Sequence, residues 1–562
     1  MSSGDGAFRW AAAILDALAG SGITDIIVAP GSRSTPFVLA AAASTRFRLH
    51  DVLDERSAGF FALGMARATG RPPLVLCTSG TAPAHVYPAV IEAGLTYLPL
   101  VVLSADRPFD LAHAAAPQTI DQTKLFGDHA RLFVELGLPD ADGAAALRRL
   151  CACAVAAALG PTPGAVHLNA RARKPLEPGR LPPAGIEAAP PPPRIHAARL
   201  TPDPAAVAEI AALLAGVRRG LIIAGPAPAG QADPSARAAA WALVAATGFP
   251  LLAEAASQLR FAGGPTPPDP ALLADLALEP PELVVQLGAP PTTAAWDRLA
   301  APRIVIAPHG CPDPSGAALH VLGSELPAAC VALAQAMVRP AGDPAWAARV
   351  AAAADRRRRA VAAELDGTGL TEGHVARAVV ASLPPGAQLA IGNSLPIRAI
   401  DTFAPERAAD VVVLHQRGAN GIDGLVSGAA GAAVATGRPT TLLLGDVSLL
   451  HDVGGLHTVR HVRGPFTIVC VNNDGGRIFE QLPVAAVPGV GAALEHFTTP
   501  HGLGFAPAAA LFGLRHVLAD SPSALAAALA RAETPTLIEA RVPPSDAAAQ
   551  ARRLAARQTE MS

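Results

Sequence analysis

Short runs of consecutive apolar residues recur along the chain, and longer amphipathic stretches separate them. The runs cover residues 26–28, 74–77, 100–103, 221–223, 283–285, 303–306, 411–414, 441–444 and 466–471. Residues 7–20 have the spacing of an amphipathic helix. Apolar runs that are bounded by Gly and Pro and alternate with helices are typical of buried strands in a parallel sheet. The pattern therefore predicts an α/β protein built from doubly wound parallel sheets.

A proline-rich segment interrupts this pattern at residues 188–204, which include four consecutive prolines, Pro190–Pro193. Proline lacks a backbone donor and favours extended backbone, so we expect a stiff linker there. We predict three α/β domains, at residues 1–187, 205–345 and 373–562. Residues 346–372 are expected to form a linker or helix. They contain the run 356–359 of four arginines, which we interpret as a solvated helix face rather than an anion site.

Composition narrows the possible classes of protein. The 562 residues include 44 Lys+Arg and 46 Asp+Glu, which gives a net charge of −2, and 51% are hydrophobic. This balance excludes disorder as the main state and argues against nucleic-acid binding. The six cysteines are scattered without a zinc-type spacing, which favours packed thiols and a cytoplasmic protein. We expect neither a signal peptide nor a membrane span.

Two predicted strand ends in the last domain carry metal-type ligands. Gly445 and Asp446 follow the run 441–444, and Asn473 with Gly475 follows the run 466–471. Ligands of doubly wound sheets bind beyond the carboxyl ends of strands. A carboxylate, an amide oxygen and closely approaching backbone suit a hard divalent cation and a diphosphate. Each piece alone could be an ordinary turn, whereas the pair predicts a site for a metal-bound diphosphate.

The first domain holds two further candidates. Asp54 and Glu55 open an apolar helix rich in small residues. Burial there would raise the pKa of Glu55 and make it a proton donor, although a carboxylate at a helix N-terminus can also have a purely structural role. The segment 78–81 ends a strand and begins a helix, so its N–H groups could point at an anion or a polar ring.

Several arginines lie beside predicted turns. They are Arg33, Arg107, Arg398 and Arg417, and Ser32 and Ser394 accompany two of them. Arginine binds carboxylates through a two-pronged, charge-assisted contact. One such arginine is commonly a surface residue, but four at strand ends would suit substrates with several carboxylates.

These motifs together resemble the thiamine diphosphate enzymes that have pyrimidine-binding, central and diphosphate-binding domains. More narrowly, they resemble the 2-succinyl-5-enolpyruvyl-6-hydroxy-3-cyclohexene-1-carboxylate synthase (MenD) family of menaquinone biosynthesis. The matching strings are PGSRSTP (30–36), DER (54–56), TSGT (78–81), SADRP (104–108), GNS (392–394), QRGANGIDG (416–424), GDVS (445–448) and NNDGGRIF (472–479). The metal motif is common to the superfamily, whereas PGSRSTP and RGANGIDG are much more specific.

The resemblance implies a reaction and roles for residues. Glu55 would bond the aminopyrimidine ring and promote its imino tautomer, which takes the thiazolium C2 proton. The ylide would attack 2-oxoglutarate, carbon dioxide would leave, and the carbanion would add to isochorismate in a 1,4-addition. Asp446, Asn473 and the Gly475 carbonyl would hold Mg²⁺ or Mn²⁺, and Ile422 would bend the cofactor.

The remaining implied contacts fall into two groups. Cofactor-binding residues would be Ser79, Gly80, Thr81, Gln118, Gly418, Ala419, Asn420, Ile422, Gly445, Asp446, Val447, Ser448, Asn473, Gly475, Gly476 and Ile478. Substrate-binding residues would be Ser32, Arg33, Arg107, Gln118, Asn393, Ser394, Arg398, Arg417, Ile478, Phe479 and Leu482. In this family Glu55 and Asp446 meet across a subunit interface, which implies a homodimer or a dimer of dimers.

The sequence departs from the family pattern at two places. Pro117 stands where members carry Asn, and Thr292 and Thr293 lie in a stretch where members often have Ser-Lys. A lysine contact to substrate from the central domain is therefore in doubt. The alternatives are another thiamine diphosphate-dependent 2-oxo acid decarboxylase or carboligase and a cofactor-free relative. The paired His-His of the decarboxylases is missing, and Glu55, Asp446 and Asn473 are all present.

Overall fold

The computed structural model describes residues 3–140, 143–181, 191–262, 266–275, 279–367, 369–404, 410–532 and 534–560. The chain forms two compact units. The first unit comprises residues 1–198, 416–437 and 451–463, and the second comprises 199–415, 438–450 and 464–562. Among the described residues, no helix has the length and apolar character needed to cross a membrane.

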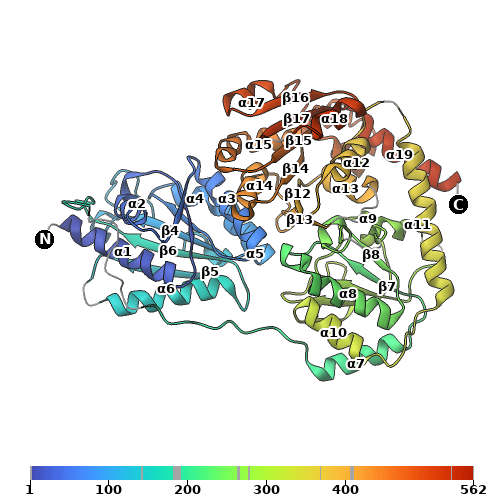
Figure 1. Ribbon diagram of the computed structural model, residues 1–562, viewed down its shortest axis with the longest axis horizontal. Helices are drawn as coiled ribbons and strands as arrows, with labels where there is room; N and C mark the ends of the chain where they lie inside the picture. The colour runs from blue at the N-terminus through green and yellow to red at the C-terminus, as the bar shows by residue number, and fades with distance from the viewer. Residues whose placement is uncertain are drawn as a thin grey trace. The chain divides into compact units, whose positions relative to one another are not determined.

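The first unit is built on a six-stranded parallel sheet (Figure 1). Its order is β2-β1-β3-β4-β6-β5. The strands are β1 (Asp25–Val28), β2 (Arg48–Asp51), β3 (Leu74–Cys77), β4 (Leu100–Asp106), β5 (Ala130–Gly137) and β6 (Ala165–Arg171). The helices include α1 (Ser3–Gly20), α2 (Thr35–Ala42), α3 (Glu55–Thr69), α4 (Ala82–His85), α5 (Tyr87–Thr96) and α6 (Ala144–Leu159). β1, β3, β4 and β6 are buried throughout, as their apolar runs require.

A helix from late in the chain completes this unit. α14 (Leu425–Thr436) packs against α3, and the 3-10 segment η7 (Val453–His461) contacts both helices. The approach is so close that a Cβ on Gly64 would lie 1.9 Å from the carbonyl oxygen of Gly428. A Cβ on Gly431 would lie equally close, 1.9 Å, to the Phe61 oxygen. The small residues in these two helices are therefore required by their packing.

The second unit contains two further parallel sheets (Figure 1). The five-stranded sheet has the order β11-β10-β9-β7-β8. Its strands are β7 (Gly220–Ala224), β8 (Leu251–Ala253), β9 (Leu283–Leu287), β10 (Arg303–Ala307) and β11 (Ala318–Gly323). The helices around it are α7 (Pro204–Ala215), α8 (Pro234–Thr247), α9 (Ala294–Asp297) and α10 (Leu326–Ala336).

The six-stranded sheet of the second unit has the order β13-β12-β14-β15-β17-β16. Its strands are β12 (Ala387–Ile391), β13 (Val411–His415), β14 (Thr440–Gly445), β15 (Phe466–Asn472), β16 (Arg515–Ala519) and β17 (Thr536–Arg541). The flanking helices are α12 (Glu372–Ser382), α13 (Leu395–Phe403), α15 (Asp446–His451), α16 (Glu495–Thr498), α17 (Ala506–Leu511), α18 (Pro522–Leu529) and α19 (Asp546–Glu560).

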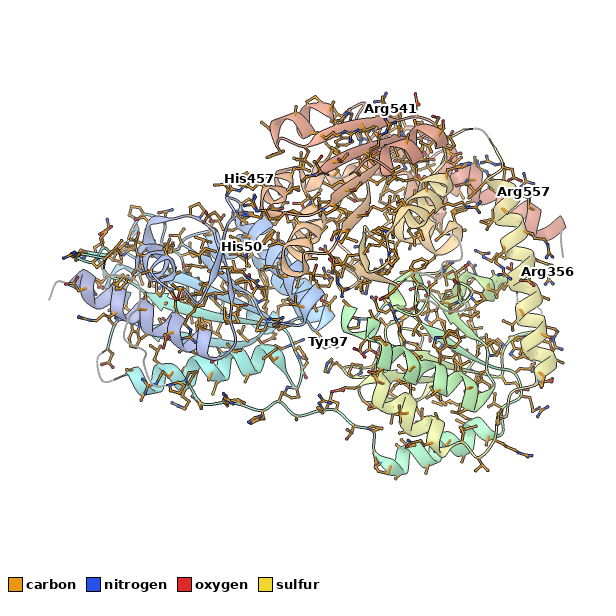
Figure 2. The ribbon with its side chains drawn as sticks, viewed as in Figure 1. His50, Tyr97, Arg356, His457, Arg541 and Arg557 are labelled. Atoms are coloured by element: carbon orange, nitrogen blue, oxygen red, sulfur yellow. The ribbon has the colours of Figure 1, made fainter. Side chains whose placement is uncertain are left out.

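The long helix α11 (Pro344–Glu364) packs against the C-terminal helix α19. Arg553 and Arg557 of α19 bind the carboxylate of Glu364 at 2.7 Å and 3.2 Å, and Figure 2 labels Arg557. α11 also carries the arginine run. Arg358 and Arg359 are exposed as expected, but Arg357 binds the buried Asp269 at 3.2 Å. The interpretation of the whole run as a solvated face is therefore wrong for Arg357.

The predicted fold class is confirmed, because all three sheets are parallel and alternate with helices. Each apolar run named from the sequence lies in a strand, and the helix expected at 7–20 lies within α1. Residues 191–203 of the predicted linker have neither helix nor strand, and residues 188–190 lie outside the described part. The domain boundaries themselves stay a prediction.

Candidate active site

The two metal-type motifs lie at neighbouring strand ends of the six-stranded sheet in the second unit. β14 pairs with β15 in parallel, with Gly445 opposite Val471. Asp446 begins α15 directly after β14, and Asn473 follows the last residue of β15. The carboxyl ends of these strands therefore place the carboxylate and the amide at the same edge of the sheet, as the sequence predicted.

Four donors hold the Asp446 carboxylate, whose residue is 1% exposed. Oδ2 accepts hydrogen bonds from the backbone N–H of Asn473 at 3.1 Å and of Gly475 at 2.9 Å. The ring Nε2 of His501 lies 3.1 Å from the same oxygen, and Oδ1 accepts from the Val447 N–H at 2.7 Å. The carboxylate is thus fixed in one orientation, as a metal-binding group requires.

The side chain of Asn473 is oriented by a buried glutamate. Its Nδ2 donates to Oε1 of Glu372 at 2.6 Å, and Glu372 is 6% exposed. Burial raises the pKa of Glu372 to about 7. Its ionised form only accepts hydrogen bonds, so that form selects the amide rotamer that turns Nδ2 toward it. Oδ1 of Asn473 is buried and has no hydrogen-bond partner among the described residues. Such an unpaired acceptor beside a fixed carboxylate fits a divalent cation.

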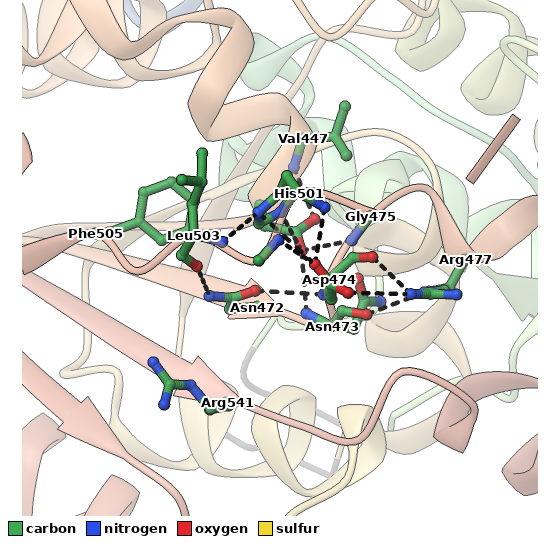
Figure 3. A network of polar contacts seen from close by, with 12 residues as sticks. Val447, Asn472, Asn473, Asp474, Gly475, Arg477, His501, Leu503, Phe505 and Arg541 are labelled. Carbon is green, nitrogen blue, oxygen red and sulfur yellow. Dashed lines mark hydrogen bonds and ion pairs between the residues drawn. The ribbon is translucent and has the colours of Figure 1, made fainter. Parts of the chain in front are cut away.

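The loop after Asn473 needs its glycine. Gly475 has φ +124°, and a Cβ there would lie 2.1 Å from the carbonyl oxygen of Thr498. Asp474, at φ 60°, accepts from the N–H groups of His501 and Gly502 at 2.9 Å and 2.7 Å. The two loops are therefore tied together (Figure 3). No cluster of three or more His, Cys, Asp or Glu side chains suited to a metal occurs in the described residues, so a cation here would need amide and backbone oxygens in addition to the Asp446 carboxylate.

The predicted apolar pocket residues follow this loop. Ile478 and Phe479 are half-buried on the 3-10 segment η8 (Arg477–Gln481), and Leu482, just after it, is 42% exposed. The Phe479 ring lies 5.5 Å from the ring of Phe497. Of the other predicted cofactor residues here, Ser448 is buried, and Gly445, Val447 and Gly476 are half-buried.

Asn393 and Ser394 lie beyond the end of β12. Asn393 is buried, and Ser394 has the left-handed φ of 72° that is rare outside glycine. Arg398, on the first turn of α13, donates from Nη1 to the Ser394 carbonyl at 2.8 Å. Arg398 also lines a cavity of about 240 Å³ together with Glu372 and Gln481. One predicted substrate residue and the glutamate that orients Asn473 thus face one cavity.

In the first unit, Glu55 begins α3 as predicted. Asp54 caps the helix by accepting the Ser57 N–H at 3.0 Å, so Glu55 is not needed for the cap. Glu55 is half-buried. Burial raises the pKa of Glu55, while its own backbone N–H and the nearby His85 oppose that rise. A carboxyl whose pKa is raised and that does not cap the helix can exchange a proton.

The structure brings Arg33, Ser79, Gly80, Arg107 and Gln118 together in the same unit. Arg107 contacts the Ser79 hydroxyl, and the Arg33 N–H donates to Thr78 Oγ1 at 3.2 Å. A Cβ on Gly80 would lie 3.3 Å from Gln118. Burial lowers the pKa of both arginines, and in Arg33 the charge of Arg107 adds to this. Two guanidinium groups close enough to repel each other favour a bound anion. The neighbouring Ser32 is exposed, and Thr81 precedes α4.

Sequence reasoning missed the polar network beneath this cluster. Gln122 is fully buried, donates to Asn169 Oδ1 at 2.9 Å, and accepts the Gly80 N–H at 3.2 Å. Arg107 and Arg171 line a cavity of about 290 Å³, where Arg171 lies 3.1 Å from Asp106. No local motif marks Gln122, because its partners lie on distant strands.

The loop 416–424 is held within the first unit by a glutamate that the sequence did not single out. The carboxylate of Glu92 on α5 accepts the N–H groups of Gly418 at 3.1 Å and Ala419 at 2.7 Å. Glu92 is 3% exposed and pairs with Arg67 at 3.3 Å. Arg417, Gly418 and Ile422 are half-buried, Ala419 and Asn420 are exposed, and Asn420 has a left-handed φ of 62°. The sequence did contain one sign of this role, because Glu92 is a charged residue within the otherwise apolar segment 87–96.

Comparison with known proteins identifies the family. Residues 8–125 match the thiamine pyrophosphate enzyme N-terminal TPP binding domain, and residues 413–540 match the C-terminal TPP binding domain. A protein of Sorangium cellulosum named 2-succinyl-5-enolpyruvyl-6-hydroxy-3-cyclohexene-1-carboxylate synthase is 48% identical, over 97% of this chain and 94% of its own. The chain belongs to this synthase family. Proteins of the same name from Myxococcus xanthus and Halobacterium salinarum are 43% and 39% identical over 92% and 91% of this chain and 91% of each of theirs.

The two departures from the synthase family pattern differ in surroundings. Pro117 is exposed beside the exposed Gln118. Thr292 is half-buried, and both its N–H and its hydroxyl contact the Glu254 carboxylate, whose residue is 1% exposed. Within the stretch where the family pattern often has Ser-Lys, Thr293 caps α9 by accepting the Ala295 N–H.

Proposed function

We propose that this protein is a thiamine diphosphate- and Mg²⁺-dependent transferase. It decarboxylates 2-oxoglutarate and adds the resulting succinyl semialdehyde carbanion to isochorismate. The product is 2-succinyl-5-enolpyruvyl-6-hydroxy-3-cyclohexene-1-carboxylate, a precursor in menaquinone biosynthesis. The observation that carries the assignment is the family membership, since relatives of this one name align over more than nine-tenths of the chain. When bound, the cofactor supplies an electron sink for the carbanion left by decarboxylation.

The proposed metal ligands are Asp446, Asn473 and the Gly475 carbonyl, with Mg²⁺ or Mn²⁺ as the ion. The unpaired Oδ1 of Asn473 and the fixed carboxylate of Asp446 support this assignment. Both are hard oxygen ligands, which Mg²⁺ prefers, and a diphosphate would complete the coordination. The remaining predicted cofactor contacts of the loops 418–422, 445–448 and 473–478 belong to the same proposal.

Glu55 is proposed as the catalytic residue, acting as a proton-holding carboxyl against the cofactor's pyrimidine ring. Its partial burial, which raises its pKa, supports this role. The proposed cofactor residues Ser79, Gly80 and Thr81 lie at the end of β3 in the same unit. The Gly80 N–H donates to Gln122, so the other N–H groups of this turn would meet a polar ligand.

The arginines are proposed to hold the carboxylates of the two substrates. Both 2-oxoglutarate and isochorismate are dicarboxylates, so several cations on the substrate path are expected. Arg33 and Arg107 are buried and close together, which supports a shared anion between them. The other proposed substrate residues are Ser32, Gln118, Asn393, Ser394, Arg398, Arg417, Ile478, Phe479 and Leu482.

A homodimer or dimer of dimers and a cytoplasmic location are part of the proposal. The oligomer rests on the family's arrangement, in which Glu55 meets the diphosphate-binding half of another subunit. The location rests on the six cysteines, all of which are free.

A coupled activity assay tests the proposed function. Purified protein receives thiamine diphosphate, Mg²⁺, 2-oxoglutarate and isochorismate, and isochorismate absorbance is followed. Loss of isochorismate only in the presence of 2-oxoglutarate supports the proposal. Decarboxylation of pyruvate with isochorismate unchanged favours the alternative, another thiamine diphosphate-dependent 2-oxo acid decarboxylase or carboligase.

A further inference from the structure

The segment 498–503 holds the end of β15 and the loop that follows it, which carries two of the proposed metal ligands. The Gly476 N–H donates to the Thr498 carbonyl at 2.7 Å. Nδ2 of Asn472 donates to the Leu503 carbonyl at 2.9 Å. The segment is therefore attached to the ligand-bearing loop at both of its ends.

His501 lies within this segment and reaches the other proposed metal ligand, Asp446. Its Nε2 lies 3.1 Å from Oδ2 of Asp446, and its side chain is 11% exposed. The other donors to this carboxylate are the backbone N–H groups of Val447, Asn473 and Gly475, which belong to the two loops that carry the proposed ligands. Among the described residues, His501 is thus the only side chain that hydrogen-bonds to Asp446, and it comes from outside those loops.

A neighbouring backbone donor determines which ring nitrogen of His501 carries the proton. The Leu503 N–H donates to Nδ1 at 3.0 Å (Figure 3). A backbone N–H can only donate, so Nδ1 must present its lone pair. The proton of the neutral ring is then on Nε2, which donates it to Asp446. Asp474 does not compete for the ring, because its Oδ1 lies 3.9 Å from Nδ1, beyond hydrogen-bond distance.

We propose that His501 is a positioning residue of the metal site, which holds Asp446 in its ligand orientation through the Nε2–H form of the ring that the Leu503 N–H selects. Groups that orient a metal ligand without touching the ion contribute to metal affinity, and loss of one typically weakens binding by about 10–100-fold. The inference rests on the proposed function, because it requires a divalent cation at Asp446.

Titration of the full-length protein with Mn²⁺ at saturating thiamine diphosphate, followed through the EPR signal of the free ion, tests this role. Two variants separate the functions of the two ring nitrogens. In His501→Asn, the side-chain oxygen can replace Nδ1 and accept the Leu503 N–H, but the side chain is too short to reach Asp446. In His501→Gln, the longer amide can replace Nε2 and donate to Asp446. Leu503 is 51% exposed, so its N–H can then bind water.

We expect His501→Asn to weaken Mn²⁺ binding by about 10–100-fold and His501→Gln to retain most of the affinity. A purely structural role in folding the segment would give the reverse order, because His501→Asn is the variant that keeps the Leu503 contact. His516→Asn is the matched control and should leave the affinity unchanged. Nε2 of His516 lies 3.0 Å from the carboxylate of Glu539 in the same sheet, which is not a proposed metal ligand.

Three results would overturn the proposal. They are equal Mn²⁺ affinity in the wild type and His501→Asn, a loss in His501→Gln at least as large as that in His501→Asn, and an equal loss in His516→Asn. Absence of Mn²⁺ binding by the wild type would overturn the metal site of the proposed function together with this inference. The two kinds of failure are therefore distinguishable, and neither readout depends on isochorismate turnover.

Discussion

Two carboxylates that follow strands, Glu55 and Asp446, have opposite surroundings. Asp446 is 1% exposed and receives three backbone N–H groups and the His501 ring. Glu55 is half-buried and has one opposing backbone N–H, while desolvation raises its pKa. Donors stabilise the charged form of a carboxyl, whereas desolvation disfavours it. Position at a strand end therefore does not set a carboxylate's chemistry; the balance between hydrogen-bond donors and desolvation around it does.

The largest expected effect is that of Asp446→Asn. It removes the charge from the fixed ligand while keeping its shape, so the metal-dependent affinity for thiamine diphosphate should fall by more than about a hundredfold, beyond the loss typical of an outer-shell partner. Calorimetric titration of the cofactor with Mg²⁺ measures this. Asp313→Asn is the control, since Asp313 lies between β10 and β11 of the five-stranded sheet, away from the proposed metal ligands, and accepts the Ala318 N–H at 2.6 Å. Equal cofactor affinity in both variants would contradict the metal assignment.

Glu55→Gln should have the next largest effect, and it should change turnover rather than cofactor affinity. Turnover of isochorismate should fall by about 10²–10⁴-fold, the range for loss of a general acid or base. Cofactor affinity should change much less, because Glu55 is not a metal ligand. Asp54→Asn keeps the helix cap to Ser57 and should retain most activity. A Glu55→Gln protein that turns over normally would show that this carboxyl is structural.

Glu372→Gln tests the orientation of Asn473. A glutamine can both donate and accept, so it no longer selects the rotamer that leaves Oδ1 of Asn473 available. We expect a loss of about 10–100-fold in Mg²⁺ affinity, as for other groups that orient a metal ligand. Glu364→Gln is the matched control, because that buried carboxylate binds Arg553 and Arg557 instead. An unchanged Mg²⁺ affinity in Glu372→Gln would show that Glu372 does not orient Asn473 for the metal.

The smallest expected effect concerns Asp452, a second donor-rich carboxylate that lies in the first unit. It accepts the N–H groups of Val426 and Ser427, yet burial raises its pKa to about 6 from 3.8. Between these values the unfolded chain has lost this proton and the folded chain keeps it, so stability falls as pH rises through that window. The shift corresponds to at most about 3 kcal/mol.

Urea denaturation of the wild type and Asp452→Asn at a series of pH values measures the contribution of Asp452 to the free energy of unfolding. The difference between their unfolding free energies should change across the window from 3.8 to about 6, because only the wild type has the titrating group. Parallel stability curves for the two proteins would show that the burial of Asp452 is compensated in the folded state.

Much of the fold was predictable because its signal is local. Runs such as 26–28 and 466–471 are apolar on both faces, which is the requirement for a strand covered by helices on both sides. β2 exposes most of its residues, β16 has only one buried residue, and neither gives such a run. Asp446, Asn473 and Glu55 were predictable because each follows a recognisable strand or begins a recognisable helix.

The hydrogen-bond partners that orient the site residues and loops were not predictable. Glu372 is 101 residues from Asn473, His501 is 55 residues from Asp446, and Glu92 is 326 residues from Gly418. A hydrogen bond over such a separation leaves no spacing in the sequence. Only the fold brings these partners together, so the electrostatics of the site had to be taken from the structure.

The coupling of decarboxylation to isochorismate consumption tests the central claim most directly. The protein would receive 2-oxoglutarate labelled with ¹³C at its 1-carboxylate, together with isochorismate, thiamine diphosphate and Mg²⁺. The account predicts that labelled carbon dioxide is released mole for mole with the loss of isochorismate, and that neither event occurs in Asp446→Asn. Labelled carbon dioxide without loss of isochorismate, or loss of isochorismate without 2-oxoglutarate, would contradict it.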